Sequence, residues 1–144
     1  MTSPDNARGV TQLEIPGLAP PVGPYAHATR AGGLIFVSGL LALDQDGRTV
    51  GPGDAAAQAE HIFATLRTIL AGVGADLGDV AKLTFFLVDL NDRAGLSAVR
   101  KRVFGDHRPA STLVQVAGLI GEGTLLEVEA IIASPAPSPA KEGS

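Results

Sequence analysis

Two alternating carboxylates near the C-terminus are the first candidates for chemistry. Glu127 and Glu129 alternate with the apolar residues of a strand-like run, so both side chains lie on one face of it. A carboxylate on such a face either lines a cleft, where it can take up a proton, or is solvated or ion-paired. Pattern alone favours the solvated interpretation, and Glu129 is interpreted as structural.

Three polar side chains could contact a small ligand. Tyr25 is the only tyrosine, and a phenol can pack on a planar ligand and donate a hydrogen bond. We expect it to line a cleft rather than to be a core aromatic, because few other aromatic side chains could define a pocket. Ser38, beside Gly39, either bonds a ligand or serves ordinary turn chemistry. Asn91 is interpreted as a helix cap, with a cleft position as the alternative.

Metal and thiol chemistry are not expected. The chain has no cysteine, so it offers neither a disulfide nor a thiolate. The three histidines, His27, His61 and His107, lack the spacing of metal ligands, and we expect no cofactor. His107, in a loop beside Arg108, is expected to be solvated.

Bulk composition narrows the class of partner. The chain has 144 residues, a length typical of one domain, and a net charge of −4 without an evident basic patch, so nucleic acid is not an expected partner. No stretch approaches the roughly 20 apolar residues that span a bilayer, so no membrane association is expected. The first residues lack the basic start and apolar core of a signal peptide, and a cytoplasmic protein is expected.

Two helices are predicted. The first begins after Asp54, a favourable N-cap, and ends at about Val73, where Gly72 and Gly74 stop it. Its apolar residues recur every three or four positions and form one wide stripe: Ala59, Ile62, Phe63, Leu66, Ile69, Leu70 and Val73. The second helix is capped by Asn91 or Asp92 and stopped by Gly105. Its inward face is formed by Leu96, Val99 and Val103.

Apolar runs predict four strands, at residues 34–38, 82–90, 112–116 and 125–132. The 82–90 run (KLTFFLVDL) is apolar on both sides and is expected to be buried on both faces. Residues 44–47 (DQDG) indicate a tight turn between hairpin strands.

The order of these elements, strands, helix, strand, helix, strands, predicts an α+β fold. The folded domain is predicted at residues 12–133, between a flexible N-terminal segment (1–11) and a disordered tail rich in Pro, Ala and Ser (134–144). Two helices can cover only one face of the sheet. We therefore expect self-association to cover the other face.

Five short motifs resemble, in order and spacing, those of the Rid/YjgF family of imine and enamine deaminases, also labelled endoribonuclease L-PSP. They are residues 23–28 (GPYAHA), 36–39 (FVSG), 85–92 (FFLVDLND), 107–112 (HRPAST) and 125–131 (LLEVEAI). The resemblance implies a chorismate-mutase-like α+β domain that forms a homotrimer with ligand clefts between subunits.

The same resemblance implies a reaction. Members hydrolyse small reactive imines and enamines, such as 2-iminobutanoate and 2-iminopropanoate, to 2-oxo acids and ammonia without a cofactor. It implies that Glu127 positions the attacking water and that Tyr25, Ser38 and Asn91 line the cleft. Water addition to a C=N bond requires placement and proton handling rather than a metal or a thiol.

The sequence departs from the family where the substrate carboxylate is bound. The family strand begins Pro-Ala-Arg, followed by Ser or Thr, whereas residues 109–112 read PAST, so that Ser111 replaces the arginine. Serine cannot make the bidentate bond of a guanidinium. Leu113 stands where a small or polar residue is frequent. Arg108 is the nearest basic residue in sequence and is expected at the rim, with a substitute role as the alternative.

Two classes of function remain open. One is a deaminase with an altered substrate, and the other is a non-catalytic sensor or regulatory trimer that binds a small metabolite in the same clefts. A ribonuclease is disfavoured by the acidic balance. A chorismate mutase would need a cationic cleft, and fold alone is a weak argument for it.

Overall fold

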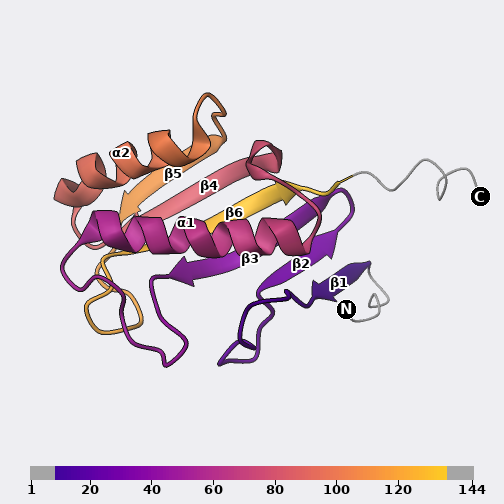
Figure 1. Cartoon of the computed structure of the whole chain (residues 1–144), viewed down its shortest axis with the longest axis horizontal. Helices are drawn as coiled ribbons and strands as arrows, with labels where there is room; N and C mark the ends of the chain where they lie inside the picture. Colours follow the sequence, from indigo (N-terminus) through magenta and orange to yellow (C-terminus); the bar gives the residue numbers. More distant parts are fainter. Residues whose placement is uncertain (1–8, 136–144) are drawn as a thin grey trace, which may run out of the picture.

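The computed structural model of the protein describes residues 9–135, which form one α+β domain (Figure 1). The strands are β1 (Val10–Leu13), β2 (Ala28–Ala31), β3 (Leu34–Leu41), β4 (Val80–Leu87), β5 (Ala110–Gln115) and β6 (Leu126–Ala133). The helices are α1 (Ala55–Gly72) and α2 (Arg93–Phe104), with 3-10 turns η1 (Leu77–Asp79) and η2 (Leu90–Asp92).

The six strands form one mixed sheet in the order β1-β2-β3-β6-β4-β5. Only the β4–β5 pair is parallel, and the other neighbours are antiparallel. Both helices lie across the same face of this sheet (Figure 1). The predicted arrangement of two helices on one face is therefore confirmed.

Helix α1 forms where the sequence predicts it. The Asp54 carboxylate accepts a hydrogen bond from the Ala57 N–H at 3.0 Å, which satisfies a donor that the first turn leaves free. The predicted stripe is buried apart from Val73, which is half-buried. Gly74, at φ +74°, adopts the left-handed backbone that ends the helix.

The core lies between the two helices and the sheet. The Phe63 ring of α1 meets Phe85 of β4 edge to face, with ring centroids 6.4 Å apart, and Phe104 of α2 at 5.5 Å. Leu66 and Ile69, about one and two turns further along α1, are fully buried. These contacts fix the position of both helices on the sheet.

The predicted strands are present with different limits. β3 continues past residue 38 to Leu41, through a register shift between Val37 and Leu40. β4 begins at Val80 and ends at Leu87. The expectation that this strand is buried on both faces is wrong for the single chain, because its residues alternate between buried and half-buried or exposed.

Strands β1 and β2 were not predicted, because their sequences, VTQL and ATRA, are short and only weakly apolar. β1 includes Val10 and Thr11, which pair with Ala31 and Arg30, so the sheet begins inside the segment predicted to be flexible. Residues 1–8 of that segment, and residues 136–144 of the predicted tail, lie outside the described residues.

The start of α2 also differs from the prediction. The carboxylate of Asp89, rather than a side chain at 91 or 92, accepts the Asn91 N–H at 2.9 Å and caps the turn η2. Asp92 stands at the N-cap of α2, but its side chain makes no capping bond. The interpretation of Asn91 as a side-chain cap is therefore wrong.

The sheet face away from the helices is uncovered in the single chain and carries exposed apolar side chains. Leu34, Phe36 and Val114 are each 40% exposed there. Within residues 9–135, no helix combines the length and the apolarity needed to cross a bilayer.

Candidate functional site

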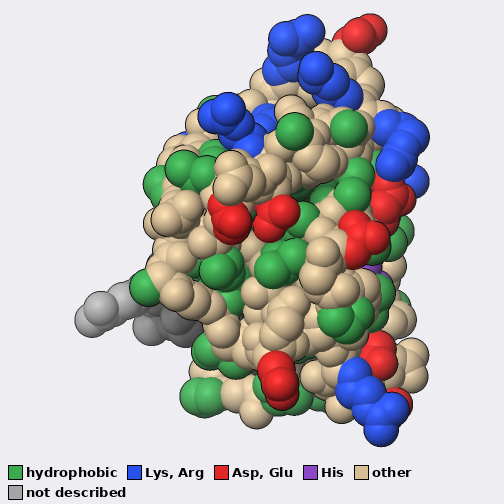
Figure 2. All heavy atoms as spheres, turned by 90° about the vertical axis from the view of Figure 1, so that its left-hand side faces the viewer, with side chains coloured by type: hydrophobic (Ala, Val, Ile, Leu, Met, Phe, Trp, Pro, Cys, Tyr) green, Lys and Arg blue, Asp and Glu red, His purple; other side chains and the backbone are tan. Residues whose placement is uncertain are grey.

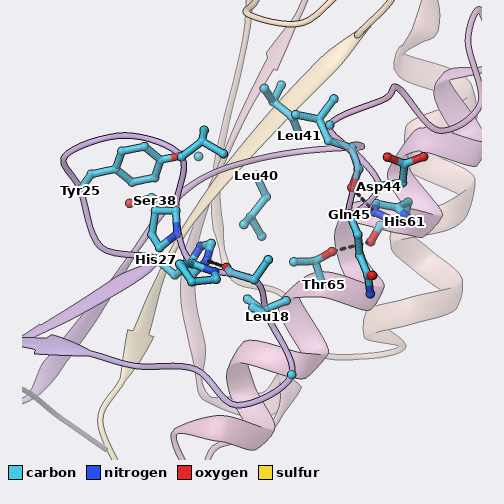
Figure 3. A pocket seen from close by; sticks show the side chains of 18 residues that line it. Leu18, Tyr25, His27, Ser38, Leu40, Leu41, Asp44, Gln45, His61 and Thr65 are labelled. Carbon is cyan, nitrogen blue, oxygen red and sulfur yellow. Dashed lines mark hydrogen bonds between the residues drawn. The ribbon is translucent and has the colours of Figure 1, made fainter.

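A pocket forms where the segment between β1 and β2 folds against the end of β3. It is an open hollow of about 460 Å³. Tyr25, His27 and Ser38 line one side, and Asp44, His61 and Thr65 line the other (Figure 3). The pocket therefore combines one aromatic ring with hydroxyl, imidazole and carboxyl groups.

Tyr25 belongs to this pocket rather than to the core. Its residue surface is 52% exposed, so the alternative of a core aromatic is wrong. A tight turn holds its backbone, in which the Tyr25 N–H donates to the Gly23 carbonyl at 2.9 Å. The ring is thus available to pack against a planar ligand.

Ser38 and His27 hold the pocket wall in place. The Ser38 hydroxyl donates to the Ala26 carbonyl at 2.6 Å, and the Ser38 N–H donates to the His27 carbonyl at 2.9 Å. Nε2 of His27 donates to the Ala19 carbonyl at 2.7 Å. Ser38 therefore has a structural bond and also lines the pocket, where its oxygen can still accept a hydrogen bond.

Glu127 lies beside this pocket on the uncovered face of the sheet, opposite Leu41 in register. Its carboxylate rests on Gly39, because a Cβ at position 39 would come within 2.7 Å of Glu127 Cδ. Burial raises the pKa of Glu127, and the neighbouring charge of Glu129 raises it further. A carboxylate with a raised pKa is a stronger proton acceptor than an ordinary glutamate.

Ser111 and Leu113 lie on the other face of the sheet. They are opposite Leu83 and Phe85 of β4, which point to the helices, and Leu113 packs partly into the core. The Ser111 hydroxyl accepts a hydrogen bond from Arg100 Nη1 at 2.8 Å. Ser111 is exposed on β5, which is an edge strand of the sheet.

The remaining predicted residues, Asn91, His107 and Arg108, make no described contact with Glu127 or with Ser111. Arg108 and Asn91 are exposed, in the loop before β5 and in η2. His107 is half-buried and its Nε2 donates to the Val80 carbonyl at 2.8 Å, so the expectation that it is solvated is wrong.

Two clusters therefore exist in one chain. We call Tyr25, Ser38, Gly39 and Glu127 the acid cluster, and Arg100, Ser111 and Leu113 the edge cluster. β6 and β5 are separated by β4, which puts their backbones about 10 Å apart, and the two clusters lie on opposite faces. Sequence reasoning missed Gly39 and Arg100, since neither contact is visible before the strand register and the helix position are known.

Basic side chains gather on α2, which carries Arg93, Arg100, Lys101 and Arg102. Figure 2 shows blue side chains collected at the upper end of the molecule, where α2 lies in Figure 1. The expectation that the basic residues do not gather into a patch is therefore wrong at α2. Within residues 9–135, no group of three or more His, Asp or Glu side chains is arranged to hold a metal ion.

Comparison with known proteins agrees with this architecture. The profile of the family described as endoribonuclease L-PSP matches residues 17–134. The chain is 39% identical over 115 residues to the 3-aminoacrylate deaminase RutC of Acinetobacter baylyi, covering 80% of this chain and 90% of that protein.

Solved structures are similar over most of the fold. E. coli TdcF with bound serine has a TM-score of 0.76 and 32% identity, over 86% of this chain and 98% of TdcF. RidA of an Antarctic Psychrobacter has a TM-score of 0.73 and 34% identity, over 80% and 93% of the two chains. The yeast protein YEO7 has a TM-score of 0.80 and 31% identity, over 88% and 99%.

A single α+β domain with a six-stranded mixed sheet and two helices on one face is the YjgF-like fold. This chain belongs to the endoribonuclease L-PSP family, the family of the Rid, YjgF and RutC proteins.

Proposed function

We propose that this protein hydrolyses small reactive imines or enamines to carbonyl compounds and ammonia, with Glu127 as the catalytic residue. The observation that carries the proposal is the half-buried Glu127 carboxylate, which rests on Gly39 beside a pocket lined by Tyr25 and Ser38. The deaminase RutC, at 39% identity, supports the same class of reaction.

The proposed reaction needs only water and a proton acceptor. Glu127 accepts a proton from a water molecule while the water oxygen bonds to the carbon of the iminium ion, the protonated imine, and the C=N π electrons move to nitrogen. The protonated Glu127 returns this proton to the amino group. The C–N bond then breaks, ammonia leaves with the bonding electron pair, and the hydroxyl proton passes to Glu127 as the C=O bond forms. An enamine first takes up a proton at its β-carbon to become the iminium ion.

We further propose that the complete site lies between subunits of a homotrimer. A ligand held by one chain's acid cluster cannot reach the same chain's edge cluster, because the two lie on opposite faces of the sheet. Covering the exposed Leu34, Phe36 and Val114 with a second copy would remove apolar surface from water. The same contact could bring one chain's acid cluster to its neighbour's edge strand. Asn91 and Arg108, near that edge, would contribute to the rim of the cleft.

The reaction can be tested by competition for a short-lived imine. An amino-acid oxidase generates 2-iminobutanoate or 2-iminopropanoate in the presence of semicarbazide, and the protein should reduce the amount of semicarbazone formed. Glu127→Gln should abolish this effect, whereas Glu129→Gln, the neighbouring isosteric change, should retain it. Wild-type protein without effect on these imines or on 3-aminoacrylate would contradict the proposal.

A second candidate is a non-catalytic trimer that binds a small metabolite in the same cleft. The specific observation in its favour is that TdcF, a structural relative, has been solved with bound serine. Binding of serine by this protein without hydrolysis of any of the imines would support this candidate over the first.

A further inference from the structure

Arg100 is a partly buried cation whose two described partners, Ser111 and Phe85, are uncharged. It projects from α2, and its guanidinium carbon lies 5.0 Å from the centre of the Phe85 ring. Nη1 donates to the Ser111 hydroxyl at 2.8 Å. Both partners are neutral, and one hydrogen bond leaves most of the five N–H donors of the guanidinium unused.

Arg102, on the same helix, has an acidic partner, whereas Arg100 has none among residues 9–135. Arg102 is exposed and forms an ion pair with Glu60, which is the one salt bridge in the described part of the chain. Arg100 is half-buried, and burial lowers its pKa. A partly desolvated charge without a counter-ion is unfavourable. The binding free energy of an anion should therefore be more favourable at Arg100 than at an exposed arginine.

The other basic residues near the edge strand are less suitable. Arg108 is exposed and makes no described contact with Ser111. Nζ of Lys82 donates to the Thr112 hydroxyl at 2.7 Å, and Thr112 faces the opposite side of the sheet from Ser111. Arg100 is therefore the cation that reaches Ser111, the position at which the substrate carboxylate is expected to bind.

We infer that Arg100 binds the carboxylate of the ligand, so that α2 supplies the guanidinium that β5 lacks at Ser111. The Ser111 hydroxyl and the Phe85 ring hold the guanidinium in place, and its free edge can form the bidentate bond that a carboxylate accepts. Resting on the proposed function, this inference narrows the substrate to imines that carry a carboxylate. Neutral imines would lack the principal contact.

Binding of a stable carboxylate tests the inference without turnover. The probes are 2-oxobutanoate and its neutral amide, 2-oxobutanamide, titrated by calorimetry against the full-length protein. Wild type should bind the acid more tightly than the amide. Arg100→Gln should weaken binding of the acid at least about tenfold and remove the preference, since a charge-assisted bidentate bond is lost.

Three variants separate this role from a structural one. Arg108→Gln, the matched control, should bind both probes as wild type does. Arg100→Lys should keep part of the preference for the acid, because it keeps the positive charge but loses the paired N–H donors of the guanidinium. Arg100→Gln combined with Ser111→Arg should recover the preference, because it returns a guanidinium to the same place from the strand.

The inference would be overturned if Arg100→Gln kept the wild-type preference, if wild type had none, or if Arg108→Gln alone removed it. A failure of the proposed function gives a different result from a failure of this inference. In that case no imine is hydrolysed, yet Arg100→Gln still removes the preference for the acid over the amide. That result supports the anion site.

Discussion

Among single residues, Glu127 is the one on which the proposed chemistry depends, through the way its carboxylate is held and charged. Its carboxylate rests on Gly39, is partly removed from water, and has Glu129 two residues away on the same sheet face. Burial is the larger cause of its raised pKa and the charge of Glu129 the smaller. Both causes favour the protonated form.

The charge of Glu129 gives a prediction about pH. Glu129→Gln removes a negative neighbour, so the pKa of Glu127 should fall, although not to its ordinary value because burial remains. The acid limb of the activity profile, which requires ionised Glu127, should shift to lower pH. Titration of the Glu127 side-chain carboxyl carbon by NMR measures the change directly, and an unchanged or raised pKa would contradict it.

The contact with Gly39 gives a second prediction. Gly39→Ala introduces a Cβ where the end of the Glu127 side chain lies, and that flexible end can move aside. Stability should change by less than about 1 kcal/mol, whereas a carboxylate displaced by an ångström should lose about a hundredfold in imine hydrolysis. Gly33→Ala, which meets nothing within 4 Å, is the matched control. Wild-type activity in Gly39→Ala would show that this contact does not position Glu127.

Among the helices and strands, the sequence predicts those that local residue patterns determine. The stripe and Asp54 cap of α1, and the existence of β3, β4, β5 and β6, follow from periodicity and capping chemistry. β1 and β2 could not be predicted, since four weakly apolar residues become a strand only by pairing, β2 with β3 and β1 with β2. Arg100 could not be predicted as a neighbour of Ser111, because that contact depends on how α2 lies across the sheet.

Gln58 is a further element-scale feature without a sequence signal. It is fully buried in α1, donates to the Gly51 and Gly123 carbonyls, and accepts the Leu125 N–H at 2.8 Å. It thereby joins α1 both to the segment just before it and to the loop before β6, which is 65 to 67 residues away in sequence. An isolated glutamine in a helical stripe does not indicate such a role.

The α1 stripe gives a stability prediction. Leu66 is fully buried between α1 and the sheet, so Leu66→Ala should reduce the free energy of unfolding by about 2–5 kcal/mol. Arg67→Ala, at the next and exposed position, should change it by less than about 0.5 kcal/mol. Chemical denaturation of the two variants measures both values. Equal costs would mean that Leu66 is not a core residue.

At the scale of the whole molecule, the uncovered sheet face and the separation of the two clusters call for the same explanation. The helices cover one face (Figure 1), the exposed apolar residues lie on the other, and the strand register places Glu127 and Ser111 on different faces. Neither feature is explained by an isolated chain. The proposed closed trimer, in which each chain meets two neighbours through different surfaces, would account for both.

The proposed trimer gives a prediction about the mass of the protein in solution and about a variant that should dissociate it. Sedimentation equilibrium should give three times the 14.6 kDa of one chain. Phe36→Glu, which puts a charge on the apolar face, should shift the protein toward monomers. Ala64→Glu, exposed on α1 at the helix side, should leave the mass unchanged. A wild-type monomer at micromolar concentration would contradict the proposed assembly.

The most direct test of the shared site is complementation between two inactive variants. Glu127→Gln damages the acid cluster and Arg100→Gln damages the edge cluster, and each trimer alone should be inactive on 2-imino acids. If every site combines the acid cluster of one chain with the edge cluster of its neighbour, unfolding and refolding an equal mixture restores about a quarter of wild-type activity, because a quarter of neighbouring pairs combine two intact clusters. If one chain supplies both clusters, every site carries a defect and the mixture stays inactive, which would contradict the account.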